Sequence, residues 1–139
     1  MRIKSKILTA FLPAKRGSID ITSEINIFIK EEGFKEGIAT VSIKGSTGAI
    51  TTIEYEPNLM KDYDEMMEKI APSNKSYHHT KTWGDYNGFS HLRSSLQKTS
   101  LSVPFINGEL FLGTWQQVIV LNFDERERNR EILIQLIGE

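Results

Sequence analysis

The alternation of hydrophobic and polar residues predicts strands at both ends of the chain. In residues 2–12 the apolar side chains, among them Ile3, Ile7 and Phe11, fall mostly at odd positions. This is the two-residue period of a half-buried strand, which ends at Pro13. Residues 37–44 and 49–55 are rich in β-branched side chains and flank a Gly-Ser-Thr-Gly segment, which indicates two neighbouring strands.

The second half of the chain is dominated by further strand patterns. Strands are predicted over residues 99–106, 118–123 and 131–137, and the charged segment 124–130 is interpreted as the turn before the last strand. Asn107 and Gly108 both tolerate positive φ and separate two apolar runs, so they predict a two-residue hairpin.

Two segments in the first half have the three- and four-residue spacing of amphipathic helices. The first has Thr22 or Ser23 as its N-cap and ends near Gly33. The second begins at Pro57, and its apolar stripe continues to Ile70. The acidic residues on its other face are expected to be solvated rather than catalytic. Residues 90–96 are expected to form a short helix or a turn.

These patterns together predict an α+β fold in one domain spanning residues 1–139. No long helix separates the late strands, which favours antiparallel pairing. We therefore expect a mainly antiparallel, β-sandwich-like domain with two helices in its first half. Both helices are expected to lie against a sheet edge or an outer sheet face.

Composition narrows the possible partners. The chain has 17 basic and 18 acidic residues, so its net charge of −1 gives no broad reason to expect nucleic acid or an anionic membrane as partner. Cysteine is absent, which leaves His, Asp and Glu as possible metal ligands. No apolar run approaches the roughly 18 residues of a membrane span, and a cytoplasmic protein is expected. The usual dinucleotide and P-loop motifs are missing.

The candidate chemistry is concentrated in residues 77–96. This segment holds all three histidines, His78, His79 and His91, together with Asp85 and Arg93. Metal ligation, proton transfer and anion binding could all be built from these side chains. Before residue 90 the segment has no helical or strand period, which indicates a long loop. The alternative is a flexible surface loop whose histidines have no special role.

A second unusual segment, Gly-Thr-Trp-Gln, interrupts the strand pattern at residues 113–116. Trp115 could stack on a heteroaromatic ring while Gln116 reads its edge, or Trp115 could be part of the core.

The sequence resembles the YjbQ-like family over nearly its whole length. The resemblance is carried by NGFSHLRSSL at 87–96, LSVPFINGELFLGTWQ at 101–116 and NFDERERNREILIQLIG at 122–138, and also by segments 18–25, 36–43 and 45–54. Members are described as secondary thiamine-phosphate synthases, which join a pyrimidine-methyl pyrophosphate to a thiazole phosphate. The resemblance implies a sandwich-like domain, a homotrimer, and a histidine site close to subunit boundaries.

The resemblance also implies which residues form the site, and we expect them to converge on one pocket. The candidate catalytic residues are His79, His91 and Arg93, with Arg93 as either the anion-binding cation or a surface salt-bridge partner. The candidate substrate-binding residues are Asn87, Ser94, Ser95, Trp115 and Gln116. The candidate ligands of a divalent metal, zinc or magnesium, are His79, His91, Glu54 and Asp85.

The chain departs from the family pattern at two positions. Gly45 replaces a histidine found in many members, and Phe89 stands where Asp or His is common. A three-histidine metal site would therefore lose a ligand unless His78, Asp85 or Glu54 substitutes.

Three function classes are compatible with the sequence. The first is the thiamine-phosphate synthase-like transferase, for which the reaction could be a secondary activity. The second is a metal-assisted hydrolase. The third is a non-enzymatic protein that binds a small phosphorylated metabolite.

Overall fold

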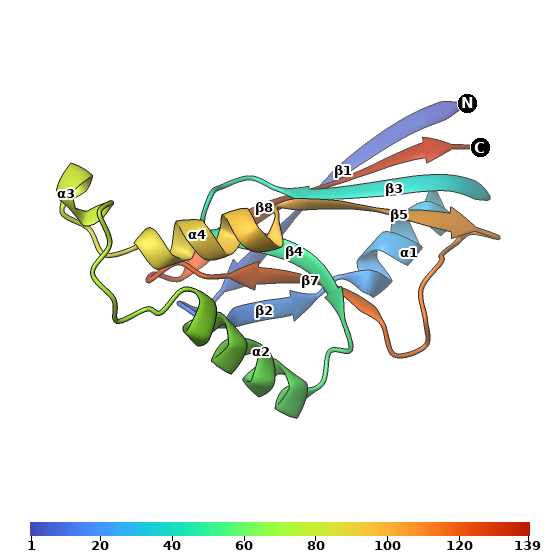
Figure 1. Cartoon of the computed structure of the whole chain (residues 1–139). Helices are drawn as coiled ribbons and strands as arrows, with labels where there is room; N and C mark the ends of the chain where they lie inside the picture. Colours follow the sequence, from blue (N-terminus) through green and yellow to red (C-terminus); the bar gives the residue numbers. More distant parts are fainter.

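Two antiparallel sheets form the frame of the protein in a computed structural model of residues 1–139 (Figure 1). The larger sheet has the order β1-β8-β3-β5-β6 and the smaller sheet the order β2-β7-β4. The strands are β1 (Arg2–Leu12), β2 (Gly17–Asp20), β3 (Glu36–Ile43), β4 (Gly48–Ile53), β5 (Ser100–Ile106), β6 (Glu109–Leu110), β7 (Gln117–Asn122) and β8 (Arg128–Gly138). The helices are α1 (Thr22–Glu31), α2 (Pro57–Ile70), α3 (Thr80–Trp83) and α4 (Gly88–Gln97). The predicted α+β class with antiparallel sheets is confirmed.

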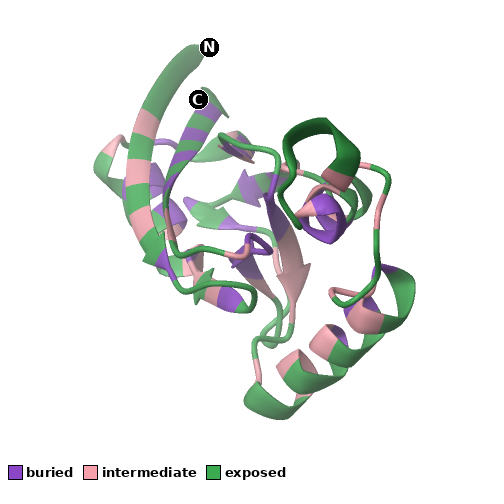
Figure 2. Cartoon of the chain, turned by 90° about the vertical axis from the view of Figure 1, so that its left-hand side faces the viewer, coloured by how far each residue is buried: buried purple, intermediate pink, exposed green.

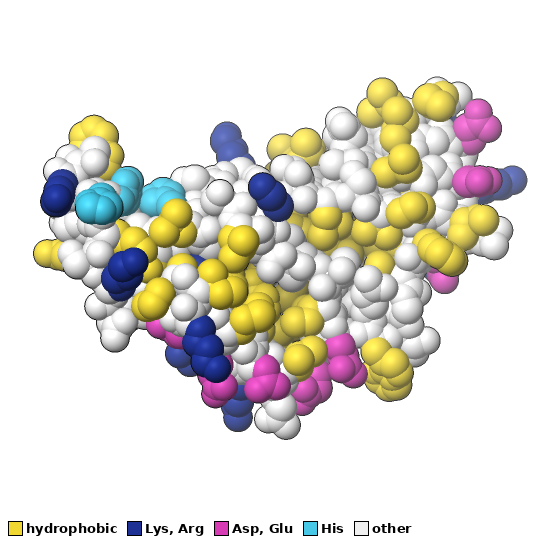
Figure 3. All heavy atoms as spheres, in the orientation of Figure 1, with side chains coloured by type: hydrophobic (Ala, Val, Ile, Leu, Met, Phe, Trp, Pro, Cys, Tyr) yellow, Lys and Arg dark blue, Asp and Glu magenta, His cyan; other side chains and the backbone are white.

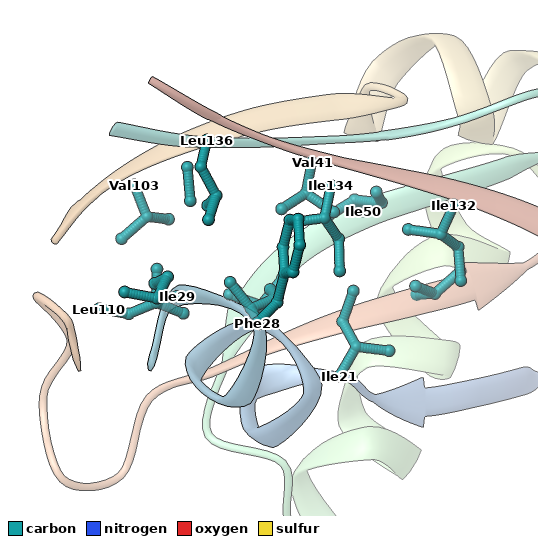
Figure 4. Packing of buried hydrophobic residues seen from close by; sticks show 14 of the residues in the cluster. Ile21, Phe28, Ile29, Val41, Ile50, Val103, Leu110, Ile132, Ile134 and Leu136 are labelled. Atoms are coloured by element: carbon teal, nitrogen blue, oxygen red, sulfur yellow. The ribbon is translucent and has the colours of Figure 1, made fainter. Parts of the chain in front are cut away.

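The main core lies between the two sheets, which curl toward each other as a half-barrel (Figure 1). Alternate residues of β8, Ile132, Ile134 and Leu136, point into it and are fully buried. Helix α1 contributes Phe28 and Ile29 from the opposite side (Figure 4). Each such side chain contributes about 1.5–3 kcal/mol on burial. Helix α1 is therefore part of the interior rather than a cover on an outer face.

A second, smaller core lies on the other face of the small sheet. In β7, Val118 and Val120 point into the main core, whereas Ile119 and Leu121 point outward and pack against α2. In Figure 2 the central strands are buried, and the face of α2 that points away from the sheet is exposed. The predicted position of this helix on an outer sheet face is confirmed.

Several local predictions are confirmed. Asn107 and Gly108 adopt φ values of 54° and 77° and join β5 to β6 in the expected two-residue hairpin. Pro57 is the first residue of α2, and the side chain of Glu56 accepts hydrogen bonds from the first backbone N–H groups of that helix.

Other local predictions are wrong. Strands β3 and β4 do not pair with each other, because β3 pairs with β5 and β8 whereas β4 pairs with β7. The N-cap of α1 is Ile21 rather than Thr22 or Ser23. The turn at 124–130 is shorter than expected, because β8 already begins at Arg128. A helix does form over residues 90–96, but it is longer than expected, because α4 has ten residues.

The apolar face of β1 is also the reverse of the expected one. The odd-numbered residues Ile3, Ile7 and Phe11 are exposed, and the even-numbered residues Leu8 and Leu12 face the core. Both faces of this edge strand therefore carry apolar side chains. None of the four helices has the length and apolar character needed to cross a membrane.

Candidate functional site

Helix α4 places His91 at one end of the small sheet. Two serines one helical turn apart fasten this helix, because Ser90 Oγ donates to Phe123 O at 2.6 Å and Ser94 Oγ donates to Gly48 O at 2.6 Å. His91 is half-buried on an adjacent face of the helix, with Nδ1 3.1 Å from Ser46 O. The imidazole is thus held by the backbone of the turn that joins β3 to β4.

The three histidines gather at this end of the molecule (Figure 3). The ring centroids of His79 and His91 are 4.9 Å apart with an interplanar angle of 75°, and His79 Nε2 lies 3.9 Å from Asp85 Oδ1. A hollow of about 290 Å³, which we call the histidine hollow, is lined by Tyr77, His78, His79, Gly88, His91 and Leu92. The fold thus places His79 and His91 side by side at this hollow.

A second hollow of about 370 Å³ adjoins the first and shares His91 with it. We call it the polar hollow, and its lining residues are Gly45, Ser46, His91, Ser94, Ser95, Lys98 and Thr99. No hydrophobic residue and no carboxylate belongs to this lining. A cavity whose lining includes a lysine, a histidine and serines but no carboxylate is suited to an anion.

Lys98 at the rim of the polar hollow has an unusual backbone conformation. Its φ of 82° and ψ of 155° lie in a region that is nearly reserved for glycine and costs about 1–3 kcal/mol for another residue. Two backbone hydrogen bonds hold it there, from Lys98 N to Ser94 O and from Ile50 N to Lys98 O. Sequence reasoning missed Lys98, because this conformation has no signal in the local sequence.

Arg93 is placed away from both hollows. Its side chain is only 5% exposed, its Nε and Nη2 donate to Ala71 O at 3.0 and 2.8 Å, and Nη2 also donates to Glu68 at 2.8 Å. Burial alone would raise the pKa of Glu68, but hydrogen bonds from Arg93 and Ser73 lower it to about 2. The expectation that Arg93 is the anion-binding cation is corrected here, since its donors join α4 to the end of α2.

Three further candidates of α4 differ in their surroundings. Ser95 is exposed and lines the polar hollow, whereas the hydroxyl of Ser94 is already used by Gly48. Asn87 is the N-cap residue of α4, and its buried Oδ1 has no hydrogen-bond partner. Phe89 is buried beneath the Arg93 guanidinium, 4.9 Å from Cζ to the ring centroid, so this departure from the family pattern serves packing.

Trp115, Gln116 and Glu54 lie at the opposite end of β4 from His91. Gln116 bonds to Thr52, near the end of this strand, while His91 contacts Ser46 before its start. With a rise of about 3.3 Å per residue, the two contacts are roughly 20 Å apart. Trp115 is 73% exposed and is therefore not a core residue. The expected convergence of Trp115 with the histidines does not occur within one chain.

The predicted metal ligands do not form a complete set. The structure contains no group of three or more His, Asp or Glu side chains arranged to hold a metal ion. Glu54 is at the far end of β4, and only Asp85 accompanies His79 and His91.

The two curled sheets with a histidine-bearing end define a recognisable structural class. The fold matches a solved structure of a hypothetical protein from Aeropyrum pernix, with a TM-score of 0.89, 25% identity, and coverage of 98% of this chain and 99% of that one.

The sequence specifies the family within that class. Residues 7–139 match the family model described as UPF0047 protein YjbQ-like, and the chain belongs to this family. A UPF0047 protein of Methanothermobacter thermautotrophicus is 39% identical over 87% of this chain and 82% of its own length. A UPF0047 protein of Archaeoglobus fulgidus is 34% identical over 86% of this chain and 90% of its own length.

Proposed function

We propose that the polar hollow binds the phosphate group of a small metabolite, with His91 as the group that transfers a proton to or from it. The observation that carries this proposal is Lys98, a lysine held in a strained backbone conformation at the rim of a cavity that no carboxylate enters. Strain of this kind persists where the surrounding structure imposes it, and it is concentrated at binding and catalytic sites.

The charge of the hollow supports an anionic ligand. The ammonium of Lys98 and the hydroxyl of Ser95 can donate to phosphate oxygens, and hydrogen bonds to charged groups contribute about 1.5–3 kcal/mol each. The His91 imidazole lies between the polar hollow and the histidine hollow, so it can reach a ligand in either. The ring nitrogens of an imidazole can donate or accept a proton, so His91 can act as a general acid or base toward such a ligand.

The adjoining histidine hollow supports a more specific form of this proposal, the thiamine-phosphate synthase-like transfer. Tyr77 and Leu92 offer it apolar surface for a heterocycle. In this reaction the thiazole nitrogen attacks the pyrimidine methylene carbon, and the carbon–oxygen bond breaks with its electron pair leaving on pyrophosphate. The polar hollow would stabilise that departing anion. A metal-assisted hydrolase would need a ligand set, and no group of three or more suitable side chains supports one here.

Calorimetric titration with inorganic phosphate and pyrophosphate tests the binding proposal. The wild-type chain is expected to bind with a stoichiometry of one, and Lys98→Ala to lower the affinity by about tenfold or more. Lys69→Ala, which removes an exposed lysine from α2, is the matched control and should bind normally. Equal affinities for wild type and Lys98→Ala would reject the proposal.

A turnover assay tests the transferase form separately. Incubation with the pyrimidine pyrophosphate and the thiazole phosphate should yield thiamine phosphate by mass spectrometry, and His91→Gln should abolish this product. Phosphate binding without any turnover would leave a non-enzymatic binding protein.

We also propose self-association into a homotrimer through the outer face of the large sheet. Exposed apolar residues are continuous there, because Ile3 pairs with Ile137 and Ile7 with Leu133 in the β1–β8 ladder, and Ile38 is opposite Ile137 from β3. Hydrophobic side chains are also visible along β3 and β5 in Figure 3. Contiguous apolar surface of this kind commonly marks a protein interface. The number of subunits rests on the family resemblance.

A further inference from the structure

Arg130 occupies a position in β8 where the strand pattern calls for an apolar residue. It precedes Ile132 and Ile134 on the inward face of the strand and is only 4% exposed. Its Nη2 donates to Thr47 Oγ1 at 2.8 Å and to Asn122 Oδ1 at 2.6 Å. Both partners are neutral, so the guanidinium has no direct counter-ion among them.

The nearest buried carboxylate, Asp124, is already engaged by other groups. It accepts hydrogen bonds from the Thr47 hydroxyl, the Arg128 side chain and the Arg126 backbone N–H. Burial alone would raise the pKa of Asp124, and these partners lower it instead. It forms ion pairs within 4.0 Å with Arg126 and Arg128 but not with Arg130. A buried charge that lacks a direct counter-ion is costly, which suggests that a counter-ion binds from outside the chain.

Two nitrogens of Arg130 remain without partners. Nε is fully buried, whereas Nη1 forms no hydrogen bond in the chain but is not fully shielded from solvent. Nη1 lies directly behind Gly45, since a Cβ atom added at Gly45 would be 2.8 Å from it. Gly45 is one of the lining residues of the polar hollow. A side chain at position 45 would contact Nη1, so the glycine leaves the space beside this one nitrogen unfilled.

We infer that Arg130 is the fixed cation of the polar hollow, and that its Nη1 donates a hydrogen bond past Gly45 to an oxygen of the bound phosphate group. This inference rests on the proposed function and adds a ligand-binding residue to it. Lys98 reaches the anion from the exposed rim, and Arg130 from the buried floor. A ligand with several acceptor oxygens, such as a phosphate monoester or a terminal pyrophosphate group, can accept from both at once.

The competing explanation is that Arg130 only fastens the turn at 44–47 to β7 and β8. In that case the two hydrogen bonds from Nη2 to Thr47 and Asn122 account for the role of Arg130, and phosphate binding does not depend on access to Nη1. The two explanations differ in the effect of covering Nη1 while Arg130 itself is unchanged.

The test is calorimetric titration of inorganic phosphate into wild type, Gly45→Ala and Gly33→Ala. Gly33 has a φ of 69° and Gly45 a φ of 131°, and no atom lies within 4 Å of a Cβ at Gly33. Gly33→Ala is therefore the control for a glycine replacement at positive φ that covers no other group. Gly45→Ala is expected to lower phosphate affinity by about tenfold or more, and Gly33→Ala to change it less than about twofold. Circular dichroism confirms that each variant is folded.

Arg130→Lys provides a second variant should Gly45→Ala fail to fold. It keeps a positive charge but cannot hold Thr47 and Asn122 while reaching past Gly45, so a comparable loss of phosphate affinity is expected. Wild-type affinity in the folded Gly45→Ala and Arg130→Lys variants would overturn the inference. If Lys98→Ala still weakens binding in that case, the proposed function stands. Absence of saturable phosphate binding by the wild type would instead reject the proposed function, and this inference with it.

Discussion

Replacing Arg93 with alanine should destabilise the fold and leave the anion site intact. The guanidinium is 5% exposed and is the link between α4 and the C-terminal end of α2, through Ala71 O and Glu68. The substitution removes the donors from a buried carbonyl and takes away the charged partner of Glu68, which keeps only its hydrogen bond from Ser73. The neighbouring ring of Phe89 also loses its contact with the cation.

The expected cost follows from these contacts. Removing one member of a buried ion pair costs about 3–5 kcal/mol, and a hydrogen bond to a charged group is worth about 1.5–3 kcal/mol. The side chain of Glu68 is 36% exposed and can be rehydrated, which reduces the cost of breaking the ion pair. We therefore expect Arg93→Ala to lower the free energy of unfolding by about 3 kcal/mol.

Urea denaturation of wild type and Arg93→Ala at pH 7 measures this cost, provided that the slope m is unchanged. The matched control is Arg126→Ala, because the Arg126 side chain is exposed and its ion pair with Asp124 has a separation of 4.0 Å. That variant should lose less than about 1 kcal/mol. A loss below about 1 kcal/mol for Arg93→Ala, or a folded variant that no longer binds phosphate, would refute this interpretation of Arg93.

Four further predictions test other parts of the account. His91→Gln should leave the thermal midpoint nearly unchanged and weaken phosphate binding, since the ring is half-buried at the rim; a lower midpoint with normal binding would make His91 structural. Acid should remove the contribution of Glu68 to stability, because its folded-state pKa of about 2 lies below its ordinary value of 4.5; this contribution is complete above pH 4.5 and is lost toward pH 2. Glu68→Gln should therefore lose less stability than wild type in urea titrations over that range. Ile7→Asp, at a residue 62% exposed on the outer sheet face, should shift sedimentation equilibrium from trimer to monomer. Trp115→Ala should change phosphate affinity less than about twofold, and a larger loss would indicate that another subunit brings Trp115 to the site.

The parts of the fold that depend on local sequence could be predicted. Strand alternation, the first position of α2 at Pro57 and the hairpin at Asn107-Gly108 each reflect the conformational preferences of a few adjacent residues. The assignment of β3 and β4 to different sheets could not be predicted, because it is decided by pairing with distant strands. The exposed face of β1 was misjudged because both of its faces carry apolar residues.

The candidate site divides in the same way. His79 and His91 lie side by side because neighbouring segments of the chain, the start of α3 and the helix α4, carry them. The sequence could not show that Arg93 is a structural rather than a ligand-binding arginine. Its role depends on which face of α4 packs against the end of α2, and that is decided by tertiary packing. Lys98 and Arg130 were missed because neither a strained φ nor the burial of a charged residue is visible in composition or spacing.

The central claim is that a phosphate group binds in the polar hollow beside His91 and Lys98. The most direct measurement is an NMR titration with inorganic phosphate that follows the ring signals of the three histidines and the backbone amide of Lys98. The His91→Gln variant assigns the His91 signals. We predict that the NMR signals of the His91 ring and the Lys98 amide change together and saturate with a stoichiometry of one phosphate per chain. The ring signals of His78, which lines only the histidine hollow, should change much less. Linear, unsaturated shifts of all three histidines, or no shift at Lys98, would contradict the claim.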